Sequence, residues 1–221
     1  MKRSVISFAS LALISGFLLT ALSTVVSGAT TSGEIPPEPS TEQGNANASR
    51  IFLDDREAQQ ASVAHLMPKG TLSLLSQGAM QHGQFAWNDD GVPGGERVVF
   101  VDLRRQTVSV YRGGHEIGTA VMLYGKPGKD TPLGSFPVLR KVADYHSRTY
   151  DAPMPHSLFI TNDGVALHGS DVRYGRATHG CIGLPPEFAK LLFQETKIGD
   201  EVIVVFSDAG ATEKLALETG G

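Results

Sequence analysis

Cysteine is almost absent from this chain, because Cys181 is the only one in 221 residues. A single thiol excludes a disulfide framework within the chain. An excess of basic charge is also lacking, since 19 Lys and Arg face 23 Asp and Glu for a net charge of −4. This balance gives no electrostatic basis for binding nucleic acid, and we expect no such partner. With 41% hydrophobic residues, the chain has enough apolar material for a core, so wholesale disorder is excluded.

The N-terminus has the pattern of a secretory signal. Lys2 and Arg3 precede an uncharged, largely apolar stretch that continues to Gly33. Small residues at 27–29 predict cleavage after Ala29, so residues 1–29 are interpreted as a signal peptide. An uncleaved anchor stays open, because the run approaches the ~20 residues that span a bilayer. Either interpretation predicts export to the periplasm or cell envelope, with no membrane contact beyond this segment.

Two segments precede the main domain. Residues 30–49 are rich in Ser, Thr and Pro and are expected to form a disordered linker. Residues 50–95 have no pattern that indicates a function. Within them we expect a helix at 54–66 capped by Asp54 or Asp55, a second short helix at 71–80, and a loop at 84–95 in which Trp87 is a packing anchor.

Short strands follow one another from residue 97. Gly113-Gly114 and residues 162–164 are hairpin turn signals, and Pro185-Pro186 opens a helix that runs to about Glu195. Many strands with few helices favour a mainly β fold, an antiparallel sandwich or partly closed barrel, over residues 96–207. Residues 208–221 are expected to be a flexible tail. The expected strands are 98–101, 107–111, 116–123, 136–142, 158–161, 165–168 and 201–206.

The residues around Cys181 are those of a nucleophile and its base. His179 lies two positions before the thiol and His168 thirteen positions before it. A histidine in contact with a thiol can take its proton. His179 could do so only through a sharp turn, whereas a loop can bring Cys181 back against His168. Gly180 leaves the backbone free to direct N–H groups at a reacting carbonyl.

Two alternatives use the same residues differently. A lone cysteine is often an inert apolar residue, but the polar neighbours Thr178 and His179 disfavour a core position. Cys181, His168 and His179 could hold a catalytic zinc, which takes three protein ligands and a water. The absence of a second cysteine and of helical ligand spacing disfavours that site. We therefore expect no metal.

The histidine and cysteine segments together resemble the signature of the L,D-transpeptidases of bacterial cell walls, an HG dipeptide followed by [S/T]HGC. Residues 131–136 (TPLGSF) are similar to the family's TPxGxF element, and residues 153–156 (PMPH) resemble its MP[Y] segment. Residues 164–169 are similar to the strand that leads into the first histidine. These elements span about half of the chain, and the family's fold is mainly β.

The resemblance assigns roles to the central residues. It implies that Cys181 is the nucleophile, that His168 is the proton acceptor and donor, and that the carbonyl of Gly169 orients the imidazole. His179 would support the loop or the substrate. The amides of Gly180 and Cys181 would form the oxyanion hole.

The resemblance also implies substrate contacts. Met154, His156 and Thr178 are expected to line the groove. The loop at 169–177 is shorter than in many relatives, and Gly183 stands where the family commonly has arginine or asparagine. We expect Arg173 or Arg176 to supply the missing contact with a substrate carboxylate.

The implied reaction is attack of the thiolate on the bond between an L-centre and the terminal D-alanine of a peptidoglycan tetrapeptide. Transfer to an amine of another stem peptide gives a 3→3 crosslink. Transfer to water would make an L,D-carboxypeptidase, and transfer to a D-amino acid an exchange enzyme. This chemistry needs no cofactor, and carbapenems are expected to acylate the thiol. A non-catalytic peptidoglycan-binding module, which would have lost the Cys–His pair, is disfavoured, and a monomer is expected.

Overall fold

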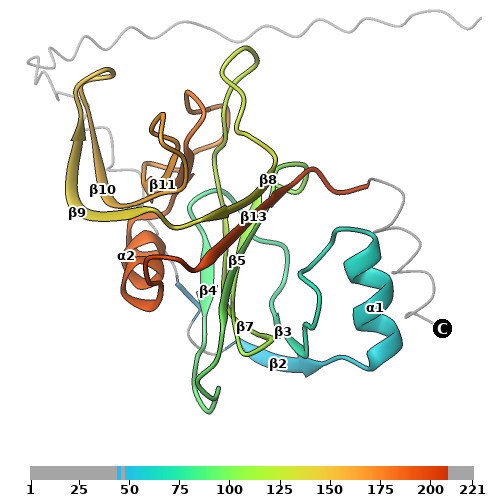
Figure 1. Cartoon of the computed structure of the whole chain (residues 1–221). Coiled ribbons are helices and arrows are strands. Elements are labelled where there is room, and N and C mark those ends of the chain that lie inside the picture. Colours follow the sequence, from blue (N-terminus) through green and yellow to red (C-terminus); the bar gives the residue numbers. More distant parts are fainter. Residues whose placement is uncertain (1–43, 46–47, 209–221) are drawn as a thin grey trace, which may run out of the picture. The chain divides into compact units, whose positions relative to one another are not determined.

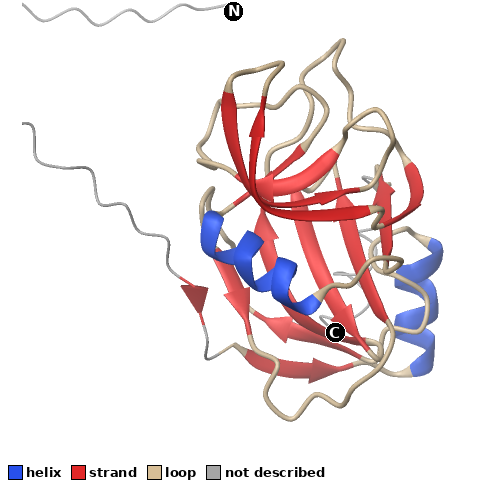
Figure 2. Ribbon diagram, turned by 60° about the vertical axis from the view of Figure 1, so that its left-hand side comes forward, coloured by secondary structure: helices blue, strands red, loops and turns tan. Residues whose placement is uncertain are grey.

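A computed structural model of the chain describes residues 44–45 and 48–208. The expected signal peptide, residues 30–43 of the expected linker and the tail from residue 209 lie outside the described residues. Within the described ranges, no helix is both long and apolar enough to cross a membrane. The described residues form two β-sheets and two helices (Figures 1 and 2).

The larger sheet, sheet A, is centred on an antiparallel meander of β5 (Arg97–Asp102), β6 (Thr107–Arg112) and β7 (His115–Val121). The C-terminal strand β13 (Glu201–Val205) pairs parallel to β5 and antiparallel to the edge strand β8 (Gly134–Pro137). The other edge carries β1 (Gly44–Asn45), β2 (Ser49–Phe52), β3 (Ser73–Ser76) and β4 (Phe85–Trp87).

The smaller sheet, sheet B, has four strands. Their order is β12 (Ile182–Leu184), β11 (Ala166–Gly169), β10 (Ala152–Phe159) and β9 (Arg140–Ser147). Strands β9 and β10 form a long hairpin, seen at the upper left of Figure 1. The mainly β prediction is confirmed, with open sheets in place of a closed barrel.

One core joins the inner faces of the two sheets. Apolar residues at alternate positions, such as Val108 and Val110 of β6, point inward, as the two-residue period of a strand requires. Helix α2 (Pro186–Glu195) contacts β10 and β11 and adds Phe188 and Leu192 to the core. Because α2 covers the inner face of sheet B, only the outer face of that sheet is available for chemistry.

The helix expected at 54–66 and the helix expected from Pro185-Pro186 to about Glu195 are both present. Helix α1 (Asp55–Val63) begins with a capping box, in which the Asp54 carboxylate accepts the Glu57 N–H at 2.8 Å and the Glu57 carboxylate accepts the Asp54 N–H at 3.0 Å. Helix α2 begins at Pro186, whose missing N–H costs nothing in the first turn. The predicted cap and the predicted proline start are therefore confirmed.

Three local predictions are wrong. The second helix expected at 71–80 is strand β3, because Ser73 and Leu75 are buried alternately and the segment pairs with β2. The loop expected at 84–95 contains β4, which pairs with β7. The strand expected at 136–142 is broken at Val138, which is buried between β8 of sheet A and β9 of sheet B.

Trp87 is the packing anchor that its position predicted. Its ring lies edge-on to Phe188 with the centroids 5.6 Å apart. Gly118 on the neighbouring strand permits this approach, because a Cβ there would lie 2.3 Å from Trp87 Cε3. The contact ties strand β4 to helix α2. Gly44–Asn45, inside the expected linker, also forms a short strand that pairs with β4.

Candidate active site

The short strand β12 is held on both sides. It pairs parallel to β11, with Leu167 opposite Ile182 and His168 opposite Gly183. On its other side, Gly183 exchanges two backbone hydrogen bonds with Leu123, at 2.8 and 2.9 Å. The backbone directly before β12 is therefore fixed relative to β11, and this backbone carries Cys181.

The register decides which side chains share a face. Leu167 and Ile182 are fully buried in the core. Since side chains alternate along a strand, Ala166 and His168 point to the outer face of sheet B. Cys181, which directly precedes Ile182, packs on that same face in a cluster with Ala166, Phe159 and Met154. The structure thus brings the thiol and the imidazole onto one face of adjacent strands.

His168 is oriented by its own backbone. Its Nδ1 lies 2.9 Å from the carbonyl oxygen of Gly169, so Nδ1–H donates to this carbonyl. The other ring nitrogen, Nε2, is then left as the proton acceptor. His168 as a residue is only 8% exposed, and burial lowers its pKa below the ordinary value, against the opposing effect of the Gly169 hydrogen bond.

The thiol of Cys181 is half-buried, with Sγ 3.8 Å from the carbonyl oxygen of Gly164. Burial raises the pKa of Cys181, and the nearby Asp163 carboxylate adds to the rise, while the Ala166 N–H opposes it. The upward pKa shift of Cys181 and the downward pKa shift of His168 both favour the uncharged form of the side chain. At neutral pH the resting pair is therefore a thiol and a neutral imidazole.

The turn before the thiol is held by its own residues. The Thr178 hydroxyl donates to the carbonyl of Cys181, and Gly180 adopts φ +111, a conformation that glycine takes without strain. The Thr178 N–H donates to the Tyr124 carbonyl at 2.9 Å, which fastens the turn to the chain beside β12. Thr178 thus shapes the backbone of the nucleophile's turn.

His179 points away from the core and meets the β9–β10 hairpin. Its exposed ring is stacked on Tyr150 with the centroids 4.5 Å apart and the planes at 19°. Tyr150 lies in the turn at the tip of the hairpin. The hairpin therefore reaches over the nucleophile's turn and forms one side of the site.

The wall of the site comes from β9 and β10. Met154 is buried in the Cys181 cluster, where Tyr145 and Val142 also pack. Arg140 of β9 lies opposite Phe159, and its guanidinium carbon is 3.8 Å above the centre of that ring. Met154 thus lies beside Cys181, and its contact with a substrate stays a prediction.

His156 does not lie in the groove beside Cys181. It has φ 55 and is skipped by the β9–β10 register, in which Pro155 pairs with Asp144 and Ser157 with Val142. Its ring packs against Phe193 of α2, with the centroids 5.6 Å apart. The left-handed backbone at His156 interrupts the pairing without shifting the register, and the ring lies against the helix, which corrects the expectation that it lines the groove.

Arg173 and Arg176 were expected to make the substrate contact that a side chain at position 183 makes in relatives. Both lie in an exposed loop. Arg173 and Arg176 both pair with Asp171, at 2.7 and 3.2 Å. At position 183, an added Cβ would lie 3.1 Å from the Cβ of Ser170, so glycine fits the close packing there. Ser170 and Thr178 fill the space beside Gly183.

Several site residues were missed by the sequence interpretation. Tyr145, Tyr150, Phe159 and Arg140 belong to a hairpin that was predicted only in part. The expected strand at 136–142 ends before Tyr145, so the alternation that continues to Ser147 was not used. Of the residues that the structure describes, no three His, Cys, Asp or Glu side chains come close enough together to hold a metal ion.

Comparison with known proteins identifies the domain. Residues 96–204 match the model of the YkuD family, described as the L,D-transpeptidase catalytic domain. The chain belongs to this family.

Among curated proteins, the chain is similar to L,D-transpeptidase 1 of Mycobacterium tuberculosis, with 29% identity over 134 residues that cover 52% of this chain and 53% of the relative. The chain therefore spans about half the length of the curated relatives it matches. Among solved structures, an L,D-transpeptidase from Stackebrandtia nassauensis is 27% identical, with a TM-score of 0.48 over 55% of this chain and 62% of that one. One from Mycobacterium smegmatis is 28% identical, with a TM-score of 0.47 over 51% and 59%.

The neutral resting pair predicts a pH profile. His168 can accept the thiol proton only when it is itself unprotonated, and its pKa is lowered. The rate constant for acylation should therefore rise with a midpoint below pH 6.5, the ordinary pKa of histidine, and then level off through neutral pH. In His168→Gln this rise below pH 6.5 should vanish. The residual rate of acylation should then rise only as the thiol ionises, toward pH 9.0 and above.

Single-turnover acylation of Cys181 measured from about pH 4 to about pH 10 tests this profile, because this range contains the ordinary pKa values of both groups, ~6.5 and ~8.5. His146→Gln is the matched control, because His146 is an exposed histidine paired with Asp151 and should leave the profile unchanged. A wild-type rate that rises only near the pKa of the thiol would contradict a role for His168 as base.

Proposed function

We propose that this chain is an exported cell-wall L,D-transpeptidase in which Cys181 is the nucleophile and His168 moves the proton. The observation that carries the proposal is the placement of both side chains on the outer face of sheet B, with His168 Nδ1–H bonded to Gly169. The family match supports the same chemistry.

The first half-reaction forms a thioester. Cys181 Sγ attacks the carbonyl that joins an L-centre to the terminal D-alanine of a tetrapeptide stem, while the thiol proton passes to His168 Nε2. The negative charge that develops on the carbonyl oxygen is stabilised by the backbone N–H groups of Gly180 and Cys181. When the C–N bond breaks, His168 gives its proton to the leaving amine, and D-alanine departs.

The second half-reaction regenerates the thiol. An amine of another stem peptide attacks the thioester, His168 accepts a proton from that amine, and the proton returns to Cys181 as the C–S bond breaks. No metal or organic cofactor is needed for either half. Water or a D-amino acid in place of the amine would give the carboxypeptidase or exchange reaction.

The stack of Tyr150 on His179 bears on this choice of acceptor. It places the tip of the β9–β10 hairpin beside the nucleophile's turn. Excluding water from a thioester favours transfer to an amine over hydrolysis. We therefore favour the transpeptidase over the carboxypeptidase. Export, inferred from residues 1–29, would place the enzyme in the periplasm or envelope, where its peptidoglycan substrate lies.

Arg140 is the substrate contact that we favour over the two loop arginines. Neighbouring strands place Arg140 opposite Phe159 and Phe159 opposite Ala166, which packs against Cys181. Stacking on Phe159 holds the guanidinium over the outer face of sheet B. No ion pair within the described ranges involves Arg140, so its N–H groups are available for a stem-peptide carboxylate.

Product analysis is the test of the proposed reaction. Incubation of the full chain with disaccharide-tetrapeptides should release D-alanine and give a crosslinked dimer, both measured by mass spectrometry. Cys181→Ala should give no product above background while keeping its melting temperature, because alanine replaces a small side chain. Free tripeptide as the main product would mean a carboxypeptidase. Activity that disappears with a chelator and returns with zinc would favour the metal alternative.

The proposed Arg140 contact predicts that Arg140→Ala affects the tetrapeptide more than a carbapenem. Arg140→Ala should raise KM for the tetrapeptide about tenfold or more, since a charge-assisted hydrogen bond is lost. Acylation of Cys181 by a carbapenem should change less, because that inhibitor lacks most of the stem peptide. Steady-state kinetics and intact-protein mass spectra measure the two effects.

Arg148→Ala is the control for the Arg140→Ala measurements, because Arg148 is an exposed arginine in the turn of the same hairpin. Arg173→Ala and Arg176→Ala, assayed alongside, test the loop as the source of the contact. An increase in KM confined to the loop variants would transfer the role from Arg140 to the loop.

A further inference from the structure

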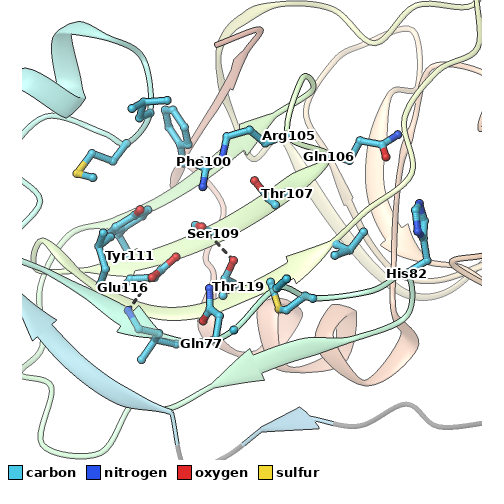
Figure 3. A pocket seen from close by; sticks show the side chains of 18 residues that line it. Gln77, His82, Phe100, Arg105, Gln106, Thr107, Ser109, Tyr111, Glu116 and Thr119 are labelled. Carbon is cyan, nitrogen blue, oxygen red and sulfur yellow. Dashed lines mark hydrogen bonds between the residues drawn. The ribbon is translucent and has the colours of Figure 1, made fainter. Parts of the chain in front are cut away.

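A cavity lies on sheet A, on the face turned away from the core (Figure 3). Its volume is about 530 Å³, within the range of small-molecule sites. Its floor consists of three cross-strand pairs of β6 and β7, namely Thr107 with Val121, Ser109 with Thr119, and Tyr111 with Glu116. The chain after α1, residues 66–67 and 74–82, supplies most of its walls.

The polar floor is unusual because it is covered. Thr107, Ser109 and Tyr111 occupy the side of β6 opposite the core residues Val108 and Val110, which is the side that faces water in most antiparallel sheets. Here Glu116 is 4% exposed and Thr119 2%. Burial of polar groups costs free energy unless they are hydrogen-bonded. A covered polar floor is therefore better explained as a binding site than as part of the core.

Glu116 lies toward one end of the cavity (Figure 3). Its carboxylate accepts the Leu75 N–H at 2.8 Å, and it makes no ion pair among the residues that the structure describes. Burial raises the pKa of Glu116, although its hydrogen bonds and the charges of Arg105 and Arg50 oppose this. The carboxylate would be stabilised by a ligand that donates hydrogen bonds to it.

The remaining polar groups are spread along the cavity. The Ser109 hydroxyl donates to Thr119 Oγ1 at 3.3 Å in the middle of the floor. Gln77 Oε1 is buried and has no partner within the described part of the chain, so it needs a donor. Figure 3 shows Gln77 and Glu116 at one end and His82 and Gln106 toward the other. Leu66, Met67 and Phe100 add an apolar wall.

We propose that this cavity binds a carbohydrate of one or two rings. Sugar hydroxyls both donate and accept, which matches a row of threonine and serine hydroxyls beside two acceptors, Glu116 and Gln77. The apolar wall suits the C–H face of a sugar ring. A simple ammonium ligand would satisfy Glu116 but would leave the hydroxyl row and the wall without partners.

The source of the sugar rests on the proposed function, under which the carbohydrate is the N-acetylated glycan that carries the stem peptides. The end of the cavity that His82 lines supports this choice (Figure 3). His82 lies edge-on to Tyr174, with the ring centroids 5.7 Å apart, and Tyr174 belongs to the loop between His168 and Cys181. A glycan held in the cavity would therefore emerge beside the active-site loop.

Binding can be measured without turnover. The full chain carrying Cys181→Ala is titrated with N-acetylglucosamine and with its β-1,4-linked dimer, by calorimetry and by amide chemical shifts. We expect saturable binding with shifts at Leu75, Ser109 and Thr119. Glu116→Gln, which keeps an acceptor for the Leu75 N–H, and Thr119→Val, which keeps the shape, should each weaken binding about tenfold.

Glu201→Gln is the matched control, because it removes a carboxylate from the same sheet outside the cavity, and it should bind like the parent. Melting temperatures confirm that each variant is folded. Three outcomes would overturn the inference: no saturable binding, binding that is unchanged in both cavity variants, or binding of ethylamine in place of the sugars. Because the Cys181→Ala background has no transfer chemistry, these outcomes are separate from success or failure of the product assay.

Discussion

The site depends on one constraint, the pairing of three-residue strand β12 between β11 and Leu123. The burial of Leu167 and Ile182 fixes the register of this pairing. A slip by one residue would turn Cys181 inward and Ile182 outward, since alternate residues face opposite sides. The core therefore determines the position of the nucleophile, and the adjacent turn through Gly180 needs only to present it.

Burial gives the site its electrostatic character. It raises the pKa of Cys181 and lowers that of His168, so the pair rests uncharged. An uncharged thiol is a poor nucleophile until its proton moves, and in the proposed mechanism the imidazole held by Gly169 takes that proton. Under the proposed mechanism, proton transfer would thereby be coupled to attack on a bound substrate. This arrangement differs from a preformed thiolate–imidazolium pair, in which the nucleophile is charged before the substrate arrives.

Much of the fold was predictable because the local signals agree with the tertiary structure. The capping box at Asp54, the prolines before α2 and the alternation along β6 each indicate the element that forms. Strand β3 was not predictable in the same way, because Ser73 and Leu75 form a strand through pairing with β2, a contact with no local signal. Tertiary pairing outweighed the short apolar pattern that favoured a helix.

The same distinction between local and non-local signals applies to the residues of the candidate site. Cys181, His168 and Gly169 lie in motifs that the sequence displays. Arg140 joins them only through register across four strands, and the covered face of β6 depends on a segment, residues 66–82, whose pattern indicated no role. Likewise, His156 has a left-handed φ and its ring packs against α2, and nothing in PMPH marks this conformation. Non-local geometry was the missing information in each case.

The central claim is that the Cys181 thiol carries the acyl group of the stem peptide. Rapid acid quench of the full chain mixed with tetrapeptide, followed by proteolysis and mass spectrometry, tests it most directly. The account predicts that the peptide containing Cys181 gains the mass of the tripeptide acyl group, with one equivalent of D-alanine released. Steady turnover with no acyl group on that peptide at any quench time would contradict it.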